Sequence, residues 1–369
     1  MDLITQGVLG AAVGQVVAGK SLGKRATRWG AVAGMVPDLD VVSRFFTDEW
    51  GALIWHRGPT HALWFGPLLG PLLGYVGWRL AHRRYRRDPT PPDPTRRHPG
   101  DPALRRAWMW VWLWALFTHP LLDVFTTYGT QLLTPFDNTR FAIDAVSIVD
   151  PLYTLPLALT LVLGWIWRRQ PGRAVAAAAV GLALTTGYLG YGTWQNARAE
   201  AAAAATLEGI PLIRVEAYPT FFQPWLRRVV AWSPGRVVRT GDLTTWAPEA
   251  GVHWQRWEEP ADPRIRILRE TPEGLLFDWF SNSNLLGQVQ GDRVRLTDLR
   301  YGMPMTPGPG GIWGVEGRFD AQGRLVGRPH RWSERRADMP VGDILRYLWT
   351  RTFGGPPWVP PDALNAAAR

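Results

Sequence analysis

The chain has 369 residues, more than one hydrophobic core usually holds, which predicts at least two structural units. It contains no cysteine, so disulfides and thiolate chemistry are excluded, and any metal must be held by His, carboxylates and water. The formal net charge of +10 is compatible with nucleic-acid binding, but the arginines concentrate in short loops between apolar runs. That placement is typical of membrane orientation and argues against a nucleic-acid partner.

Apolar residues are distributed unevenly along the chain. The mean hydropathy of -0.12 is typical of a soluble protein. Apolar runs nevertheless concentrate in the first half of the chain, while charged residues and prolines dominate the second half. The 22 tryptophans are far above ordinary usage, and many stand at the ends of apolar runs, where an amphipathic ring suits the headgroup level of a bilayer. These are Trp29, Trp55, Trp64, Trp78, Trp108, Trp165, Trp167 and Trp194. The first half therefore predicts an integral membrane protein in contact with the lipid bilayer.

Six apolar runs predict an α-helical membrane bundle of about six short transmembrane helices over residues 1–200. Residues 59–81 and 173–194 are long enough to cross a hydrocarbon layer of ~30 Å. The shorter runs are residues 3–18, 29–46, 107–122 and 151–167. Beside Arg-rich loops, these runs together favour a membrane bundle over buried soluble helices. The first run is predicted to be a retained helix, because Asp2 stands where a signal peptide would carry basic residues.

Three basic clusters predict how the chain crosses the membrane. The positive-inside rule places residues 20–28, 79–106 and 168–173 in the cytoplasm. Threading six helices through these loops puts the N-terminus and everything after residue 194 outside the cytoplasmic (inner) membrane. This topology gathers one set of polar residues on the outer face: Asp2, Asp38, Asp40, His56, His61, His119, Asp123 and Asp150. Polar residues lie near helix ends in any membrane protein, so the convergence fits either a shared site or coincidence.

Residues 201–369 predict a mainly-β extracytoplasmic domain. Alternating apolar and polar residues, separated by Gly and Pro turns, are typical of antiparallel strands. The predicted strands are residues 212–217, 227–232, 236–243, 275–280 and 293–299. Residues 341–353 predict a helix, which a proline-rich tail follows.

Two histidines flank a Gly-Pro turn in His56-Arg57-Gly58-Pro59-Thr60-His61. Five residues of separation put two helical side chains about 140° apart, so the pair cannot share one helix face. Proline is favoured in the first helical turn, which predicts a helix starting at Pro59, with His56 on the incoming loop. The two side chains would then converge on one ion, or each would make an ordinary interfacial hydrogen bond.

His119 and Asp123 are four positions apart and are expected on one helix face. The pair suits shared metal coordination, a carboxylate that orients the His, or a hydrogen bond that only satisfies two polar groups. Pro120 removes one backbone hydrogen bond and is expected to kink the helix.

Pro37-Asp38-Leu39-Asp40 places two carboxylates on one turn. Their oxygens suit a divalent cation, or either residue caps the turn after the proline. Asp150 stands before Pro151 and is better explained as a helix N-cap.

These motifs, in this order, resemble the YdjM-like membrane-bound metal-dependent hydrolases. The matching blocks are Met1-Asp2-Leu3-Ile4-Thr5, Gly34-Met35-Val36-Pro37-Asp38-Leu39-Asp40, the two His motifs, Thr126-Thr127-Tyr128-Gly129-Thr130-Gln131-Leu132-Leu133-Thr134-Pro135-Phe136 and Asp150-Pro151-Leu152-Tyr153. The resemblance covers roughly residues 1–200, with a looser likeness at Asp298-Leu299-Arg300-Tyr301-Gly302. Family members commonly have Thr-His where this chain has Thr5-Gln6, so either a possible ligand is missing here or that position is not essential.

The resemblance implies an inner-membrane hydrolase that uses a divalent metal. Carried over by position, its metal ligands would be Asp38, His56, His61, His119 and Asp123. Zinc fits such His and carboxylate donors, and Asp40 or Asp123 could act as general base or hold a second ion. The outer-face position suggests a lipid or phosphoester substrate.

Two other classes of function remain open. A non-catalytic membrane scaffold or binding protein would use the β domain to engage a partner, with the His and Asp cluster structural. A transporter is less consistent with the sequence, because its ionisable residues lie at helix ends instead of near the bilayer midplane.

Overall fold

The structure is a computed structural model that describes residues 1–92, 97–302, 308–333 and 341–356. The chain divides into two compact units, Met1–Tyr191 and Gly192–Arg369, and the boundary falls inside one long helix. The predicted proline-rich tail beyond residue 356 lies outside the described residues.

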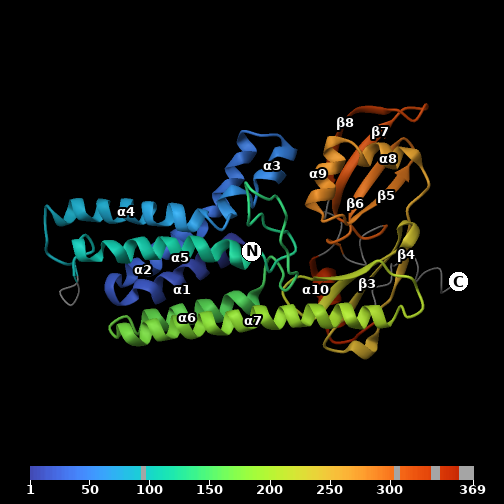
Figure 1. Cartoon of the computed structure of the whole chain (residues 1–369). Helices are drawn as coiled ribbons and strands as arrows, with labels where there is room; N and C mark the ends of the chain where they lie inside the picture. Colours follow the sequence, from blue (N-terminus) through green and yellow to red (C-terminus); the bar gives the residue numbers. More distant parts are fainter. Residues whose placement is uncertain (93–96, 303–307, 334–340, 357–369) are drawn as a thin grey trace. The chain divides into compact units, whose positions relative to one another are not determined.

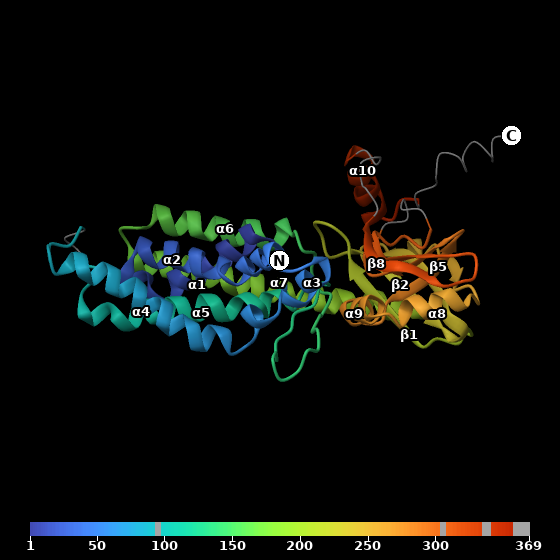
Figure 2. The same ribbon diagram turned by 90° about the horizontal axis from the view of Figure 1, so that it is seen from above.

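The first unit is helical (Figures 1 and 2). Its long helices lie side by side and are α1 (Leu3–Leu22), α2 (Lys24–Met35), α4 (Phe65–Tyr85), α5 (Arg105–Asp123), α6 (Pro151–Ile166) and the first part of α7 (Pro171–Ala205). Shorter pieces connect them: α3 (Glu49–Trp55) and 3-10 turns at Pro37–Phe45, Pro59–His61 and Pro102–Leu104. Helix α1 contacts α2, α5 and α6.

Two predicted helices have different bounds in the structure. The run 29–46 is not one helix, because α2 ends at Met35 and a 3-10 turn follows from Pro37. The run 59–81 does not start its helix at Pro59 either, since Pro59–His61 is a separate 3-10 turn and α4 begins at Phe65. Proline at the first helical position fits a 3-10 turn as well as an α-helix, so the residue type alone did not distinguish them.

Close backbone contacts at glycine hold the helix pairs together. A Cβ atom on Gly10 or on Gly30 would stand 2.2 Å from the other's carbonyl oxygen, so α1 and α2 approach closely only because both are glycine. Helix α4 uses Gly66, Gly70 and Gly74 in the same way against the backbone of α5. Small residues four apart are the usual basis of tight helix packing in membranes.

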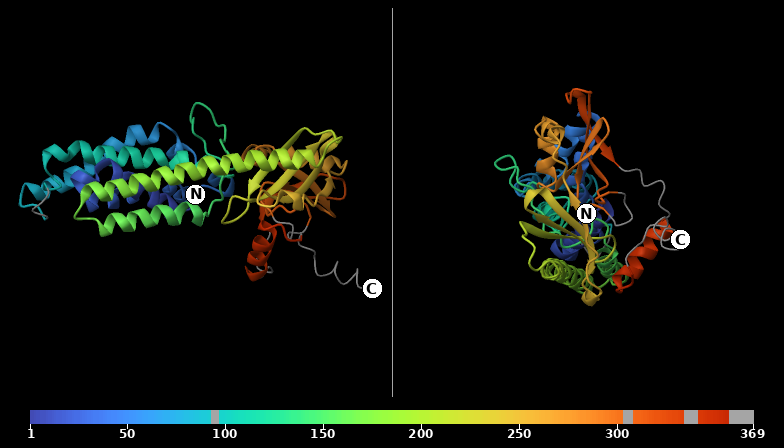
Figure 3. Two further views of the ribbon diagram at one scale, coloured as in Figure 1. Left: turned by 90° about the horizontal axis from the view of Figure 1, so that it is seen from below. Right: turned by 90° about the vertical axis from the view of Figure 1, so that its right-hand side faces the viewer.

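One described helix, α7, is both long and apolar enough to cross a membrane (Figure 3). Helix α6 is apolar but has 16 residues. Helices α1, α4 and α5 have 20, 21 and 19 residues, but they are less apolar than a membrane span requires. Length and composition therefore support one of the six predicted transmembrane helices.

The second unit contains two four-stranded antiparallel sheets. The first is β1 (Arg214–Pro219), β2 (Leu226–Ser233), β3 (Val237–Thr244) and β4 (Gln255–Glu258), and the second is β5 (Leu285–Gln290), β6 (Arg293–Asp298), β7 (Trp313–Phe319) and β8 (Leu325–Ser333). Buried side chains from both sheets share one core: Tyr218, Val230, Trp232, Val238, Leu286 and Leu299. The expected helical region followed by a β-rich region is thus confirmed.

Three short helices complete this unit: α8 (Pro263–Arg269), α9 (Pro272–Phe280) and α10 (Val341–Thr352). The prediction of a strand at residues 275–280 is wrong, because these residues belong to α9. Thr271 caps that helix by accepting a hydrogen bond from the Gly274 amide, and Pro272 occupies its first turn. These two start signals outweigh the local apolar pattern.

Candidate metal centre

Four of the predicted ligands converge at one end of the helical unit. Asp38 comes from the 3-10 turn Pro37–Phe45 and His61 from the 3-10 turn Pro59–His61. His119 and Asp123 come from α5. One donor atom from each side chain lies within 4.8 Å of the other three. The side chains of His61, His119 and Asp123 are fully buried, whereas Asp38 keeps 14 % exposure. The only partly open side of the cluster is therefore at Asp38.

Hydrogen bonds orient both imidazoles so that Nε2 faces the centre. His119 Nδ1 lies 2.6 Å from the carbonyl oxygen of Gly34, so this nitrogen carries a proton and Nε2 is the donor atom of the neutral ring. His61 Nδ1 lies 3.0 Å from Thr60 Oγ1 and 3.3 Å from Asp40 Oδ2. Because the Thr60 hydroxyl donates its own proton to Asp40, it accepts from His61, which assigns the Nδ1 proton in the same way. The two Nε2 atoms stand 3.0 Å apart. Two facing lone pairs at this distance repel each other, so either a shared cation lies between them or one Nε2 carries a proton and donates it to the other.

The donor distances fit a small tetrahedral site. His61 Nε2 lies 3.2 Å from Asp123 Oδ2 and 3.7 Å from Asp38 Oδ1. His119 Nε2 lies 3.5 Å and 3.6 Å from the same two oxygens. Donors about 2.0–2.1 Å from a tetrahedral zinc stand about 3.3 Å from one another. The five distances that involve a histidine therefore lie close to the spacing of a tetrahedral zinc site.

Asp123 has one satisfied oxygen and one unsatisfied oxygen. Oδ1 accepts a hydrogen bond of 3.0 Å from Gln6 Nε2 and also contacts the α-amino group of Met1. Oδ2 is buried and accepts no hydrogen bond; Arg57 Nε lies 3.2 Å away but is not aligned to donate. A buried carboxylate oxygen without a donor is costly, and a bound cation would satisfy it.

The other two predicted site residues lie beside this cluster. Asp40 Oδ1 is 2.8 Å from His56 Nδ1, and its Oδ2 accepts a hydrogen bond of 2.8 Å from the Arg57 amide. Thr60 Oγ1 donates to the same Oδ2 at 3.3 Å. Asp40 thus holds both motif histidines, because His61 Nδ1 also faces it. His56 lies outside the four-residue group and contacts it through Asp40 and through an edge-on ring contact with His61, 6.4 Å between centroids.

Comparison with known proteins identifies the family. A model of the family described as YdjM inner membrane protein matches residues 1–198, more than half of the chain. The chain belongs to the YdjM inner membrane protein family. Inner membrane protein YbcI of Escherichia coli (strain K12) is 27% identical over 175 residues, which cover 45% of this chain and 90% of that protein. No solved structure matches the chain.

Membership of the YdjM inner membrane protein family makes the chain a membrane protein. The matched region contains every residue of the metal cluster and ends at residue 198. Both sheets follow residue 198, so the second unit lies almost entirely beyond the match.

Arg57 was not predicted from the sequence, although it lies inside the first His motif. Its φ of 59° is left-handed, which costs a non-glycine residue about 1–2 kcal/mol. Its buried guanidinium donates to Thr126 Oγ1 at 2.8 Å and lies over the Tyr128 ring, 4.9 Å from the centroid. Its carbonyl accepts from the Gln131 amide at 3.0 Å. The YdjM block that begins at Thr126 therefore holds the His motif in position.

Gln6, at a position where the family commonly has His, supports the cluster through hydrogen bonds. It bridges the site by donating to Asp123 Oδ1 and, at 3.2 Å, to the carbonyl oxygen of His119. The sequence signal for this role was the departure from the family pattern itself.

Asp2 and Asp150 do not join the cluster: each caps the N-terminus of a helix, α1 and α6 respectively. The N-cap prediction for Asp150 is confirmed.

Proposed function

We propose that this protein is a membrane-bound metal-dependent hydrolase in which Asp38, His61, His119 and Asp123 hold one divalent cation, most suitably zinc. The observation that carries the proposal is the pair of Nε2 atoms facing each other at 3.0 Å beside the unsatisfied Asp123 Oδ2. Neutral imidazole and carboxylate donors in this number suit zinc better than calcium or magnesium, which prefer oxygen ligands alone.

The residues around the cluster set the tautomers of the histidines and offset the charge of the carboxylates. Thr60 with Asp40, and the Gly34 carbonyl, fix the tautomers of His61 and His119, so Nε2 is the atom that each neutral ring offers to a metal. Arg57 offsets part of the negative charge of the carboxylates. Both oxygens of Asp40 already have partners, so we assign it a positioning role in place of the general-base role predicted from the sequence.

A zinc ion bound here would lower the pKa of a coordinated water towards ~7 and so supply a nucleophile for ester hydrolysis. Asp38 is the donor that reaches the surface and lies farther from His61 Nε2 than Asp123 does. We therefore assign water and substrate entry to the Asp38 side. With the site at the outer face of the inner membrane, as the arginine loops predict, the substrate would be a lipid or another phosphoester.

A structural metal is the second candidate, and the burial of the cluster favours it. Four protein donors complete a tetrahedron, as in structural zinc sites, whereas catalytic zinc keeps one position for water. In that case the ion would tie the two 3-10 turns to α5, and the protein would serve as a membrane scaffold whose β unit engages a partner.

Metal content tests both candidates. Elemental analysis of detergent-purified full-length protein should give about one zinc per chain, since the four donors form a single site. His119→Ala should lose the metal while the exposed His253→Ala control retains it. Metal-free protein that takes up no added zinc, manganese or calcium would overturn the site.

Hydrolysis separates the candidates once metal is established. A panel of carboxylic esters, phosphomonoesters and phosphodiesters should be cleaved by the wild type and by His253→Ala, but not by His119→Ala. Metal that raises the unfolding temperature without cleavage of any of these substrates would favour the structural role.

A further inference from the structure

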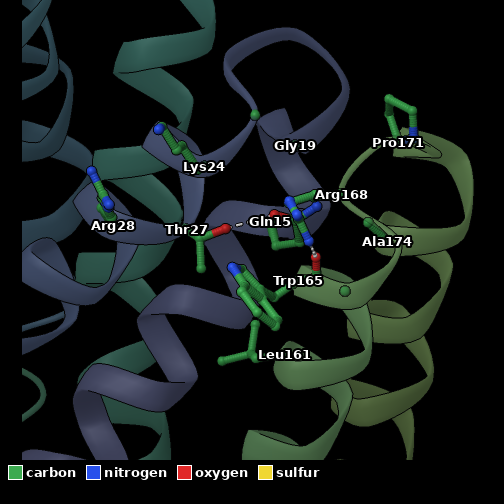
Figure 4. Close-up of a pocket in the computed structure, with 12 residues that line it drawn as sticks. Gln15, Gly19, Lys24, Thr27, Arg28, Leu161, Trp165, Arg168, Pro171 and Ala174 are labelled. Atoms are coloured by element: carbon green, nitrogen blue, oxygen red, sulfur yellow. Dashed lines mark hydrogen bonds between the residues drawn. The ribbon is translucent and has the colours of Figure 1, made fainter.

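A second feature lies at the other end of the helical unit, where α1, α2, α6 and α7 surround a cavity of about 350 Å³ (Figure 4). Its lining residues are Gln15, Gly19, Gly23, Lys24, Thr27, Arg28, Leu161, Gly164, Trp165, Arg168, Pro171 and Ala174. Gln6 of the metal centre and Gly19 of the cavity are 13 residues apart on α1, or about 20 Å at the helical rise. The two sites are therefore separate.

The charge around the cavity is positive and uncompensated. Lys24, Arg28 and Arg168 line it, and none of its lining residues is acidic. Residues 3–35 and 151–191, which supply all four helices here, contain no Asp or Glu. Within the described part of the chain, none of these three side chains forms an ion pair. An anion from outside the chain would supply the missing charge.

The neighbouring arginines show the same excess of positive charge. Burial, followed by the charges of Arg28 and Arg84, lowers the pKa of Arg25 on the adjacent face of α2. Positive groups crowded together in this way favour an anion that neutralises them.

The cavity also has an apolar and aromatic wall. Leu161, Trp165 and Ala174 lie along it, and the Arg168 guanidinium sits 4.9 Å from the centroid of the Trp165 ring. Figure 4 shows Thr27 hydrogen-bonded to Gln15; Thr27 Oγ1 donates to Gln15 Oε1 at 2.6 Å. The amide NH2 of Gln15 has no acceptor among the described residues, so it remains a donor for a ligand. Cations, an amide donor and an apolar wall together suit a ligand that is anionic at one end and apolar at the other.

We propose that this cavity binds the phosphate headgroup of an anionic membrane lipid, with Arg28, Arg168 and Lys24 around the phosphate and the acyl chains along Leu161 and Ala174. Basic pockets between membrane helices are suited to anionic headgroups, and cations near the cytoplasmic surface attract them. A free phosphate would use the same cations but would leave the apolar wall without a partner. This site does not depend on the metal centre or on hydrolysis.

The test is lipid binding by full-length protein in detergent, followed by native mass spectrometry. Wild type is titrated with phosphatidylglycerol, with phosphatidylcholine and with phosphatidylglycerol in excess inorganic phosphate. The variant Arg28→Gln/Arg168→Gln removes two charges from the cavity. The matched control Arg83→Gln/Arg87→Gln removes two charges from a neighbouring cavity that includes Arg25 and Trp108.

Phosphatidylglycerol should bind the wild type in preference to phosphatidylcholine, and inorganic phosphate should not displace it. Arg28→Gln/Arg168→Gln should weaken that binding by about 10–30-fold, the effect of roughly 1 kcal/mol for each cation. The control should bind as the wild type does. Lys24→Gln, an exposed single change, should weaken binding less and serves if the double variant does not fold.

Three results would overturn the proposal. Equal binding of the two lipids would show that the headgroup is not recognised. An equal loss in the control would show general surface electrostatics in place of a site. Displacement by inorganic phosphate would identify a free anion as the ligand.

Discussion

The two ends of the helical unit differ in the sign and the burial of their charged side chains. At the metal centre, the carboxylates of Asp38, Asp40 and Asp123 are buried or nearly so, and neighbouring residues hold each donor in place. At the basic cavity, Lys24, Arg28 and Arg168 are exposed, and no carboxylate accompanies them. Fixed geometry suits an ion with short bonds and strict angles, whereas exposed cations on long side chains suit a headgroup that needs charge but no single orientation.

Asp123→Ala should cause the largest effect at the metal end. It removes a metal donor and leaves the Arg57 guanidinium buried without its charge partner, so stability should fall by about 3–5 kcal/mol. Elemental analysis and thermal unfolding, each with and without chelator, measure the two losses. Asp123→Asn keeps the volume and should lose metal with a smaller stability loss. Wild-type metal content in both variants would contradict the assigned ligand.

His56→Ala should have an intermediate effect and sharpens the difference between a ligand and a supporting residue. His56 supports the centre through Asp40 and a ring contact with His61 and is not one of the four donors, so zinc affinity should fall by about 10–100-fold without being abolished. Competition with a chromophoric chelator measures the affinity, with His61→Ala as the complete-loss reference. Complete loss in His56→Ala would make His56 a direct ligand, as the family resemblance implies.

Gly30→Ala should have the smallest effect, and it tests whether the two ends share one framework. Its added Cβ would meet the Gly10 carbonyl and separate α1 from α2, at a cost of about 1–3 kcal/mol. The matched control is Gly187→Ala on α7, where a Cβ meets nothing within 4 Å. Thermal unfolding and lipid binding should both worsen only for Gly30→Ala. Equal behaviour of the two variants would show that this close approach does not support the unit.

Local sequence signals predicted the elements well where a capping residue, a proline or a regular alternation of apolar and polar residues marks them. Asp150 before Pro151 marked the start of α6, and alternation marked β1, β2, β3 and β6. Residues 275–280 were misassigned, because a short apolar run fits a strand or a helix and the cap at Thr271 lies outside it. The glycines of α1 and α2 recur four apart in the sequence, a readable signal of tight helix packing.

The sequence by itself determined the residue types of the candidate metal centre, the family and the positive end of the helical unit, because these follow from local motifs and charge. The tertiary structure alone decided which side chains face each other. His61 and His119 are 58 positions apart, and Gly34 and His119 are 85 apart, so their contacts depend on how α2, α5 and the 3-10 turns pack. It also separated His56 from the four-residue group, since a backbone turn at Arg57, and not spacing, sets where each motif residue points.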